Sequence, residues 1–176
     1  MLSLDAPAAV APTLVLAVGN PSRGDDALGP RAAERIAALR LDGVEVLTDF
    51  QLQVEHALDL LGRARVLFVD ASAALAAPYS LLPVAAAPHP SYTSHALAPA
   101  AVLHGYAQLI GTPPPAWVLA IRGEAFELGA APGPRALAAL EAALAAVEPW
   151  LRRAPSGRTR ETPAPAPVAR AGLSLG

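Results

Sequence analysis

The sequence of 176 residues contains no cysteine, which excludes disulfides, thiolate metal sites and a cysteine nucleophile. No apolar run reaches the ~18 residues that a membrane-spanning helix requires. The first residues also lack the basic flank and long apolar centre of a signal peptide. The net charge of −2 predicts no basic face for nucleic acid. Together these absences favour a cytoplasmic protein that binds neither membranes nor nucleic acid.

Proline and alanine are abundant at the two ends of the chain. Residues 1–12 are expected to form a flexible leader. Residues 154–176 are rich in proline, alanine and arginine and show no apolar periodicity, which predicts a disordered tail. The intervening residues 13–153 suffice for a single domain with a sizeable core.

Apolar runs typical of buried strands alternate with stretches of helical periodicity. Strands are predicted over residues 14–18, 44–47, 66–69, 79–84 and 116–121. Helices are predicted over residues 30–39, 54–61 and 134–152, with a further one that follows His95 and ends near residue 110. The alternation predicts a three-layer α/β/α fold with a mostly parallel, five-stranded sheet. Because proline cannot donate a ladder hydrogen bond, Pro83 places the fourth strand at an edge.

Two of these helices show an apolar face. In the helix over residues 54–61 this face is expected to comprise Val54, Leu58 and Leu61. The last helix carries apolar residues at three- and four-residue steps, which predicts a packed stripe. Its members are Leu137, Leu140, Leu144, Val147 and Leu151.

A turn-rich loop with two acidic residues, residues 19–29, follows the first predicted strand. It has neither a Gly-x-Gly-x-x-Gly pattern nor a Gly-Lys-Ser/Thr step, and its two carboxylates would repel a phosphate. Asp25 and Asp26 stand at the head of the next helix, where acids also complement the helix dipole. That structural role stays open for Asp25, whereas a functional role is favoured for Asp26 by residues further along.

Two further polar residues are predicted to lie at the same edge of the sheet as Asp26. Asp70 directly follows a buried strand, and the carboxyl ends of parallel strands share one edge. His95 precedes a helix, whose positive end favours the neutral imidazole that binds metals. Each residue has a structural alternative, since Asp70 can cap a turn and a loop histidine is often merely exposed. Together, two carboxylates and an imidazole form an incomplete shell that suits nickel or zinc.

Other chemical schemes fit the sequence less well. There is no Gly-x-Ser-x-Gly elbow for a serine nucleophile, and Ser94 is too close to His95 in sequence to align with it. His56, with its acidic neighbours, is expected on a solvated face. His89 is a reserve ligand, and His104 falls within a helix.

Three segments resemble the NiFe-hydrogenase maturation endopeptidases, in order and at compatible intervals, from about residue 13 to residue 150. They are Leu16–Pro21 with Gly24–Gly29, then Val66–Ala71, then Ser94–His95. The segments 49–52 and 122–129 look closest to the branch that serves soluble, NAD-linked hydrogenases. Ala27 departs from the family pattern, in which many members have glycine; alanine is tolerable there unless φ is positive.

The resemblance implies a protease that removes a C-terminal extension from the hydrogenase large-subunit precursor after nickel insertion. It maps the family's nickel-contacting positions onto Asp26, Asp70 and His95, and it assigns catalysis to Asp26 and Asp70. The nickel is carried by the precursor, although another divalent metal can take its place in the isolated protein. The expected partner is that precursor, and the protease is expected to be a cytoplasmic monomer.

Three alternatives remain at this point. The protein could be a non-catalytic, nickel-dependent checkpoint, or a self-contained metallohydrolase that holds its own zinc. A small-ligand-binding α/β domain is the least favoured, because the predicted edge is acidic and poor in glycine.

Overall fold

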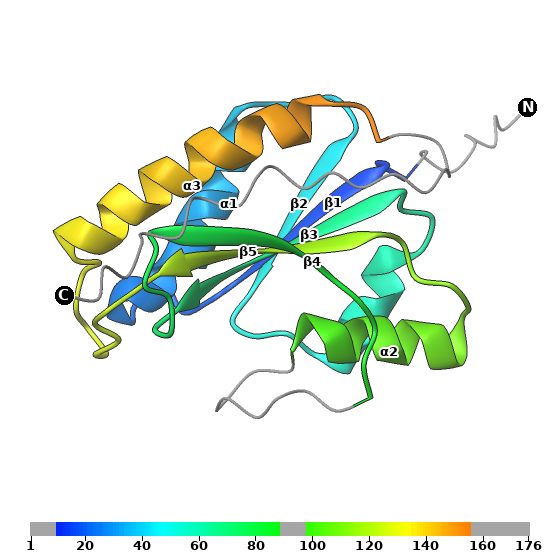
Figure 1. The fold of residues 1–176 in the computed structure, drawn as a ribbon, viewed down its shortest axis with the longest axis horizontal. Coiled ribbons are helices and arrows are strands. Elements are labelled where there is room, and N and C mark those ends of the chain that lie inside the picture. The colour runs from blue at the N-terminus through cyan, green and yellow to red at the C-terminus, as the bar shows by residue number, and fades with distance from the viewer. Residues whose placement is uncertain (1–9, 89–97, 156–176) are drawn as a thin grey trace, which may run out of the picture.

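The computed structural model describes residues 10–88 and 98–155 and contains one five-stranded sheet with helices on both faces (Figure 1). The strands are β1 (Thr13–Val18), β2 (Val44–Asp49), β3 (Arg65–Ser72), β4 (Tyr79–Val84) and β5 (Ala116–Arg122). The helices are α1 (Leu28–Ala38), α2 (Pro99–Leu109) and α3 (Pro134–Arg152). Two 3₁₀-helices, η1 (Gly24–Ala27) and η2 (Val54–Leu60), follow β1 and β2.

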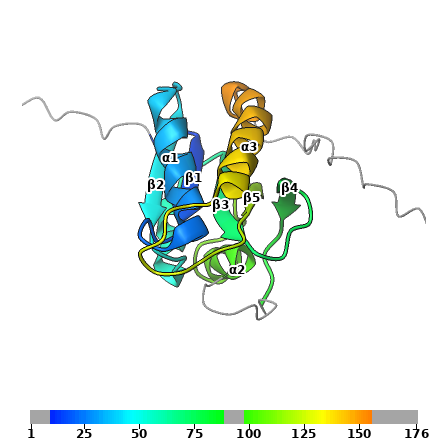
Figure 2. The same cartoon turned by 90° about the vertical axis from the view of Figure 1, so that its left-hand side faces the viewer.

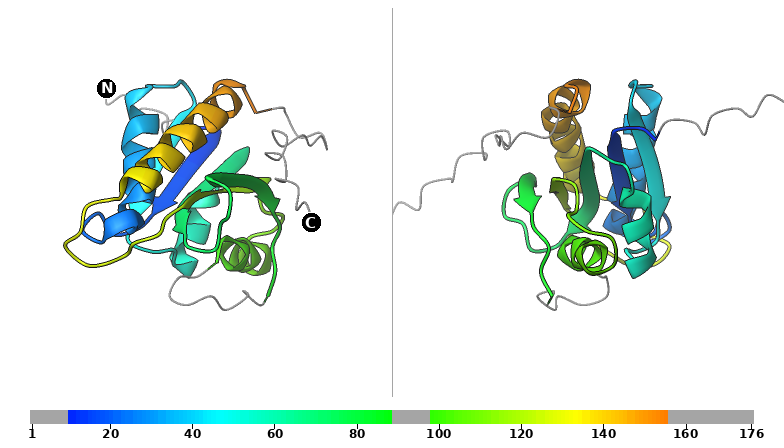
Figure 3. Two further views of the ribbon diagram at one scale, coloured as in Figure 1. Left: turned by 60° about the vertical axis from the view of Figure 1, so that its left-hand side comes forward. Right: turned by 90° about the vertical axis from the view of Figure 1, so that its right-hand side faces the viewer.

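The sheet has the strand order β2-β1-β3-β5-β4, and only its last pair is antiparallel. α1 and α3 lie side by side on one face, and α2 lies on the other (Figures 2 and 3). The predicted three-layer, mostly parallel fold is therefore confirmed. Pro83 lies on the edge strand β4, as its missing N–H predicts.

Both faces of the central strands are buried, so the core has two halves. Beneath α1 and α3, Val15 and Leu67 are fully buried, and beneath α2 and η2, Leu14 and Val66 are. Burial on both faces explains why these strands read as continuous apolar runs rather than alternating ones. None of the helices in residues 10–88 and 98–155 is long and apolar enough to cross a membrane.

The predicted apolar face of residues 54–61 is wrong. The segment is a 3₁₀-helix, and its buried residues are Ala57 and Leu60, whereas Leu58 and Leu61 are 60% and 45% exposed. A 3₁₀-helix has about three residues per turn, so residues three apart share a face. The prediction assumed α-helical spacing and therefore assigned the wrong residues to the buried face.

The apolar stripe of α3 is confirmed except at its first member. Leu140, Val147 and Leu151 are buried, and Leu144 packs against the core, but Leu137 is 36% exposed. Leu137 lies in the first turn of the helix, close to the carboxyl edge of the sheet.

The predicted domain boundaries stay predictions, although residues 10–12, which lie in the predicted leader, contact the domain. The carbonyl of Pro12 accepts hydrogen bonds from the N–H groups of Ala64 and Arg65, at 2.8 and 3.1 Å. The carbonyl of Ala11 accepts one from Arg63.

Candidate active site at the carboxyl edge of the sheet

The loop after β1 is packed tightly against the end of that strand. A Cβ atom on Gly19, which has a φ of +144°, would collide with the carbonyl of Asp26. A Cβ on Gly29 would collide with the carbonyl of Val18. These two glycines therefore allow the chain to turn back and carry η1 directly over the carboxyl edge.

Asp26 lies in η1 and is partly buried. Its Oδ2 accepts a hydrogen bond of 2.9 Å from the backbone N–H of Asn20, the second residue after β1. This bond holds the carboxylate beside the end of β1, where the sequence analysis places it.

Asp70 lies inside β3 rather than after it, which corrects the predicted end of this strand. The pairing of β1 with β3 ends at Ala17 and Val69, whereas β5 pairs with β3 as far as Ser72. Asp70 is therefore the first residue of β3 beyond the stretch that pairs with β1. Successive side chains of a strand point to opposite faces of the sheet, so Asp70 lies on the face opposite to Val69 and on the same face as Phe68. This is the face that α2 covers.

The carboxyl group of Asp70 holds its proton more strongly than an ordinary aspartate. Burial raises its pKa to about 7, a hydrogen bond from the N–H of Ala71 (2.8 Å) opposes the change, and the negative charge of Asp26 adds to it. The effect of Asp26 requires the two carboxylates to be close to each other. Two side chains from separate segments thus lie near each other at one edge of the sheet.

The third predicted ligand, His95, lies outside the described residues, as do Ser94 and His89. Within the described parts of the chain, no three acidic or histidine side chains gather as a metal site. The metal-binding roles of Asp26, Asp70 and His95 therefore stay predictions. The helix that follows His95 in sequence, α2, covers the same face of the sheet on which Asp70 lies.

Asp25 has a role that the sequence analysis missed. It is 1% exposed, and its carboxylate accepts backbone N–H bonds from Glu124 (2.6 Å), Ala125 (2.9 Å) and Gly133 (2.8 Å). Burial by itself would raise the pKa of Asp25, but the three hydrogen bonds outweigh it, so the pKa lies below its usual value. Its partners are backbone groups about 100 residues away, which no sequence pattern marks.

This carboxylate joins η1 to the loop of residues 123–133, which connects β5 to α3. The two segments run beside each other at the strand ends (Figure 3). Further backbone bonds join them, from Gly24 N to Ala130 O (3.0 Å) and from Gly129 N to Ser22 O (2.7 Å). Gly24 has a φ of +53°, and a Cβ there would collide with the carbonyl of Ala125. The two loops therefore form one closely packed unit.

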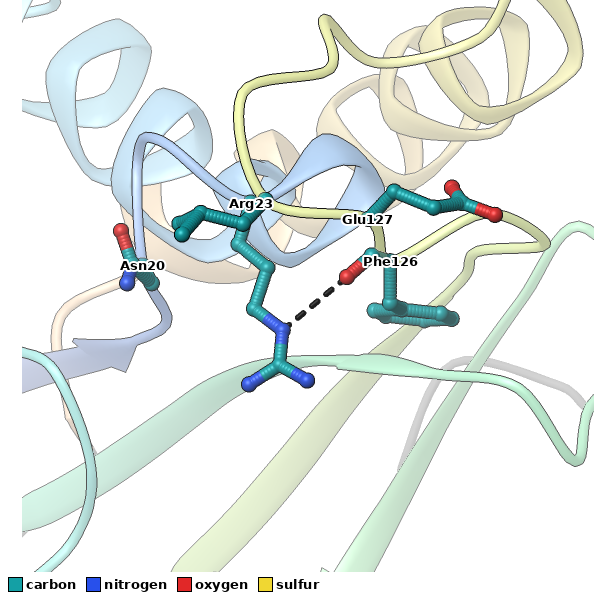
Figure 4. A pocket seen from close by; sticks show the side chains of 5 residues that line it. Asn20, Arg23, Phe126 and Glu127 are labelled. Carbon is teal, nitrogen blue, oxygen red and sulfur yellow. Dashed lines mark hydrogen bonds between the residues drawn. The ribbon is translucent and has the colours of Figure 1, made fainter.

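A pocket of about 680 Å³ opens between these two loops (Figure 4). Asn20 and Arg23 line it from the first loop, and Phe126, Glu127 and Leu128 from the second. The backbone N–H of Asn20 is the group that hydrogen-bonds Asp26, so the pocket adjoins that carboxylate.

His56 has a structural role rather than the predicted solvated position. Its Nδ1 accepts a hydrogen bond from the N–H of Gln53 (2.9 Å), and its Nε2 lies 3.3 Å from Oδ2 of Asp49. The side chain is only 12% exposed. It therefore caps the start of η2 and connects it to the end of β2.

Solved structures of known proteins share this architecture. The hydrogenase maturating endopeptidase HybD of E. coli matches with a TM-score of 0.63 and 26% identity, over 80% of this chain and 91% of its own. The NiFe-hydrogenase maturation protease HycI of Thermococcus kodakarensis KOD1 matches with a TM-score of 0.64 and 17% identity, over 81% and 94%. The endopeptidase HycI of E. coli matches with 0.61 and 22%, over 78% and 90%.

This is the fold of the hydrogenase maturation endopeptidases. No protein-family model matches the chain, and no curated protein matches it. The resemblance to these endopeptidases that the sequence motifs predicted is confirmed by the structural matches. Ala27, which departs from the motif of the hydrogenase maturation endopeptidases, has a φ of −69° and a ψ of −6°. Since this is ordinary helical backbone, alanine fits there without strain.

Proposed function

We propose that this protein is an endopeptidase that removes the C-terminal extension of a NiFe-hydrogenase large-subunit precursor after nickel insertion. One observation carries the proposal: two carboxylates from separate segments, Asp26 and Asp70, lie near each other at the carboxyl edge of a sheet whose fold is that of the hydrogenase maturation endopeptidases. Open α/β sheets bind their ligands at this edge.

The two carboxylates suit a divalent ion that arrives with the substrate. They repel each other in the free protein, and a cation that contacts both of them relieves this repulsion. Nickel accepts carboxylate oxygen and imidazole nitrogen as ligands. Asp26 and Asp70 therefore anchor the nickel of the precursor, and His95 is assigned the third position.

Binding of the precursor through its nickel would also explain how a folded protease selects one peptide bond. An ion held by two or three ligands of the protease fixes the neighbouring substrate backbone relative to this edge. A precursor without nickel lacks the anchor and should stay uncut. Nickel is thus part of the substrate and reports that insertion is complete.

The test is to incubate the purified protein with nickel-loaded and nickel-free precursor and to measure product masses. Loss of the C-terminal extension is expected only from the nickel-loaded form. Asp26→Asn, Asp70→Asn and His95→Ala should abolish this loss while thermal unfolding shows that the variants are folded. The matched control is Asp42→Asn, since Asp42 is an exposed acid two residues before β2, at the opposite edge of the sheet.

Three results would contradict the proposal. Normal cleavage by Asp70→Asn would remove the assigned role of that carboxylate. Binding of the precursor without any change in mass would favour the checkpoint alternative. Purification with stoichiometric metal and hydrolytic activity without precursor would favour a metallohydrolase.

A further inference from the structure

The pocket beside Asp26 has a built geometry that the proposed chemistry at Asp26 and Asp70 does not use. Its walls come from the loop after β1 and the loop after β5, which Asp25 joins through three backbone hydrogen bonds. Because both walls belong to one packed unit, the pocket keeps its position relative to Asp26. Its volume of about 680 Å³ is large enough for a short piece of peptide.

Arg23 presents a guanidinium group to this pocket, oriented by one hydrogen bond across it. Its Nε donates a hydrogen bond of 3.0 Å to the carbonyl of Phe126, which leaves the two terminal nitrogens for other partners. Figure 4 shows these nitrogens pointing away from that carbonyl. Among residues 10–88 and 98–155, no carboxylate forms an ion pair with Arg23. A guanidinium of this kind matches the geometry of a carboxylate.

The opposite wall of the pocket is mixed. Leu128 is 78% exposed, and Phe126 also contributes to the lining. The carboxylate of Glu127 points away from Arg23 in Figure 4, so it does not neutralise the guanidinium. A carboxylate with an apolar group next to it would therefore find complementary surfaces on both walls.

We propose that this pocket is a peptide subsite, in which Arg23 selects a substrate segment that carries a carboxylate beside an apolar side chain. The inference rests on the proposed endopeptidase function, because a subsite next to Asp26 would hold the substrate chain close to the predicted nickel position. The carboxylate can come from an acidic side chain or from the C-terminus of the extension. Arg23 is a specificity-determining residue in either case.

The test uses the full-length protein and four short peptides, with binding followed by NMR shifts of backbone amides at low salt. Ac-Glu-Leu-NH₂ offers a side-chain carboxylate, and Ac-Gln-Leu-OH offers a C-terminal one. Ac-Gln-Leu-NH₂ and Ac-Lys-Leu-NH₂ are the neutral and cationic controls. We expect at least one carboxylate peptide to shift the amides of residues 126–128 and to bind about tenfold more tightly than both controls, as one charge-assisted pair of about 1.4 kcal/mol would give.

Variants assign this selectivity to Arg23. Arg23→Gln should remove the preference for the carboxylate. Arg23→Lys should retain only part of it, because lysine keeps the positive charge but lacks the two parallel N–H donors of a guanidinium group. The matched control is Arg152→Gln, which also removes one positive charge but does so near the end of α3. There Arg152 forms an ion pair with Glu148 of the same helix. With nickel-loaded precursor, Arg23→Gln should raise KM and leave kcat unchanged.

The outcomes separate the subsite from the proposed function. Equal binding of carboxylate and control peptides, or unchanged selectivity in Arg23→Gln, overturns the subsite even if the precursor is cleaved. If the precursor is never cleaved but carboxylate peptides still bind through Arg23, the endopeptidase proposal fails and the pocket stands as a peptide-binding site. Asp26→Asn should abolish cleavage while peptide binding persists.

Discussion

Replacing Asp25 should destabilise the protein far more than replacing its neighbour Asp26. In Asp25→Ala, the partly buried N–H groups of Glu124, Ala125 and Gly133 lose the buried carboxylate that they share as acceptor. Each unsatisfied N–H costs about 1–3 kcal/mol, and water can reach part of this loop, so we expect a loss of about 3–5 kcal/mol in the free energy of unfolding. That is a large fraction of the roughly 5–15 kcal/mol that holds a typical domain folded.

Asp26→Asn is the matched comparison. Within residues 10–88 and 98–155, Asp26 accepts one backbone hydrogen bond, from Asn20, and the amide oxygen of asparagine can accept the same bond. Its unfolding free energy should therefore stay within about 1 kcal/mol of the wild type. Asp25→Asn should fall between the two, because one of the two acceptor oxygens becomes an NH₂ group that faces N–H donors.

The assay is urea unfolding at pH 7, followed by circular dichroism, and then repeated at lower pH. The pKa of Asp25 is lowered in the folded protein, so its stabilising effect is complete above the unfolded value near 3.8 and is lost as the pH falls below it. The difference between wild type and Asp25→Asn should therefore shrink below about pH 4. If Asp25→Ala unfolds within about 1 kcal/mol of the wild type, the assignment of Asp25 as the link between the two loops is wrong.

Two further predictions concern Asp70 and Arg65. In the folded protein the pKa of Asp70 is raised to about 7 from 3.8. Ionisation of this carboxyl group therefore costs more in the folded than in the unfolded protein, and above about pH 7 it opposes folding in full. Asp70→Asn removes this cost and should stabilise the protein by at most about 4 kcal/mol at pH 8. This gain should be small near pH 4 and should grow up to about pH 7 in urea unfolding; a gain that does not change with pH would contradict the cause given for the pKa. Arg65 is 7% exposed and stacks on the ring of Trp150, with 4.0 Å between its guanidinium carbon and the ring centre. It donates hydrogen bonds to Thr13 Oγ1 and to the carbonyls of Leu151 and Arg153. Arg65→Met should therefore lower the free energy of unfolding by about 2–4 kcal/mol. Arg65 lies at the amino edge of β3. The folded variant should therefore keep the wild-type rate of the proposed precursor cleavage, and a loss of kcat without loss of stability would refute this structural role.

Local sequence patterns predicted most of the elements and the mostly parallel character of the sheet, but not the order of its strands. The continuous apolar runs predicted the strands, because strands buried on both faces need apolar side chains throughout. Pro83 predicted the edge position of β4, since its missing N–H cannot serve a central strand. The rule that parallel strands share a carboxyl edge predicted that Asp26 and Asp70 lie at the same edge, whereas the path that turns Asp26 back over this edge depends on the close packing at Gly19 and Gly29.

The contacts of Asp25, His56 and Arg23 were decided only by the tertiary structure. Each of them binds backbone groups or lines a pocket with residues that the sequence does not mark, and the partners of Asp25 and Arg23 lie about 100 residues away. The raised pKa of Asp70 likewise depends on burial and on the distance to another charge. A linear pattern reports side-chain type and spacing, whereas hydrogen bonds to distant backbone and the electrostatics of burial exist only once the chain has folded.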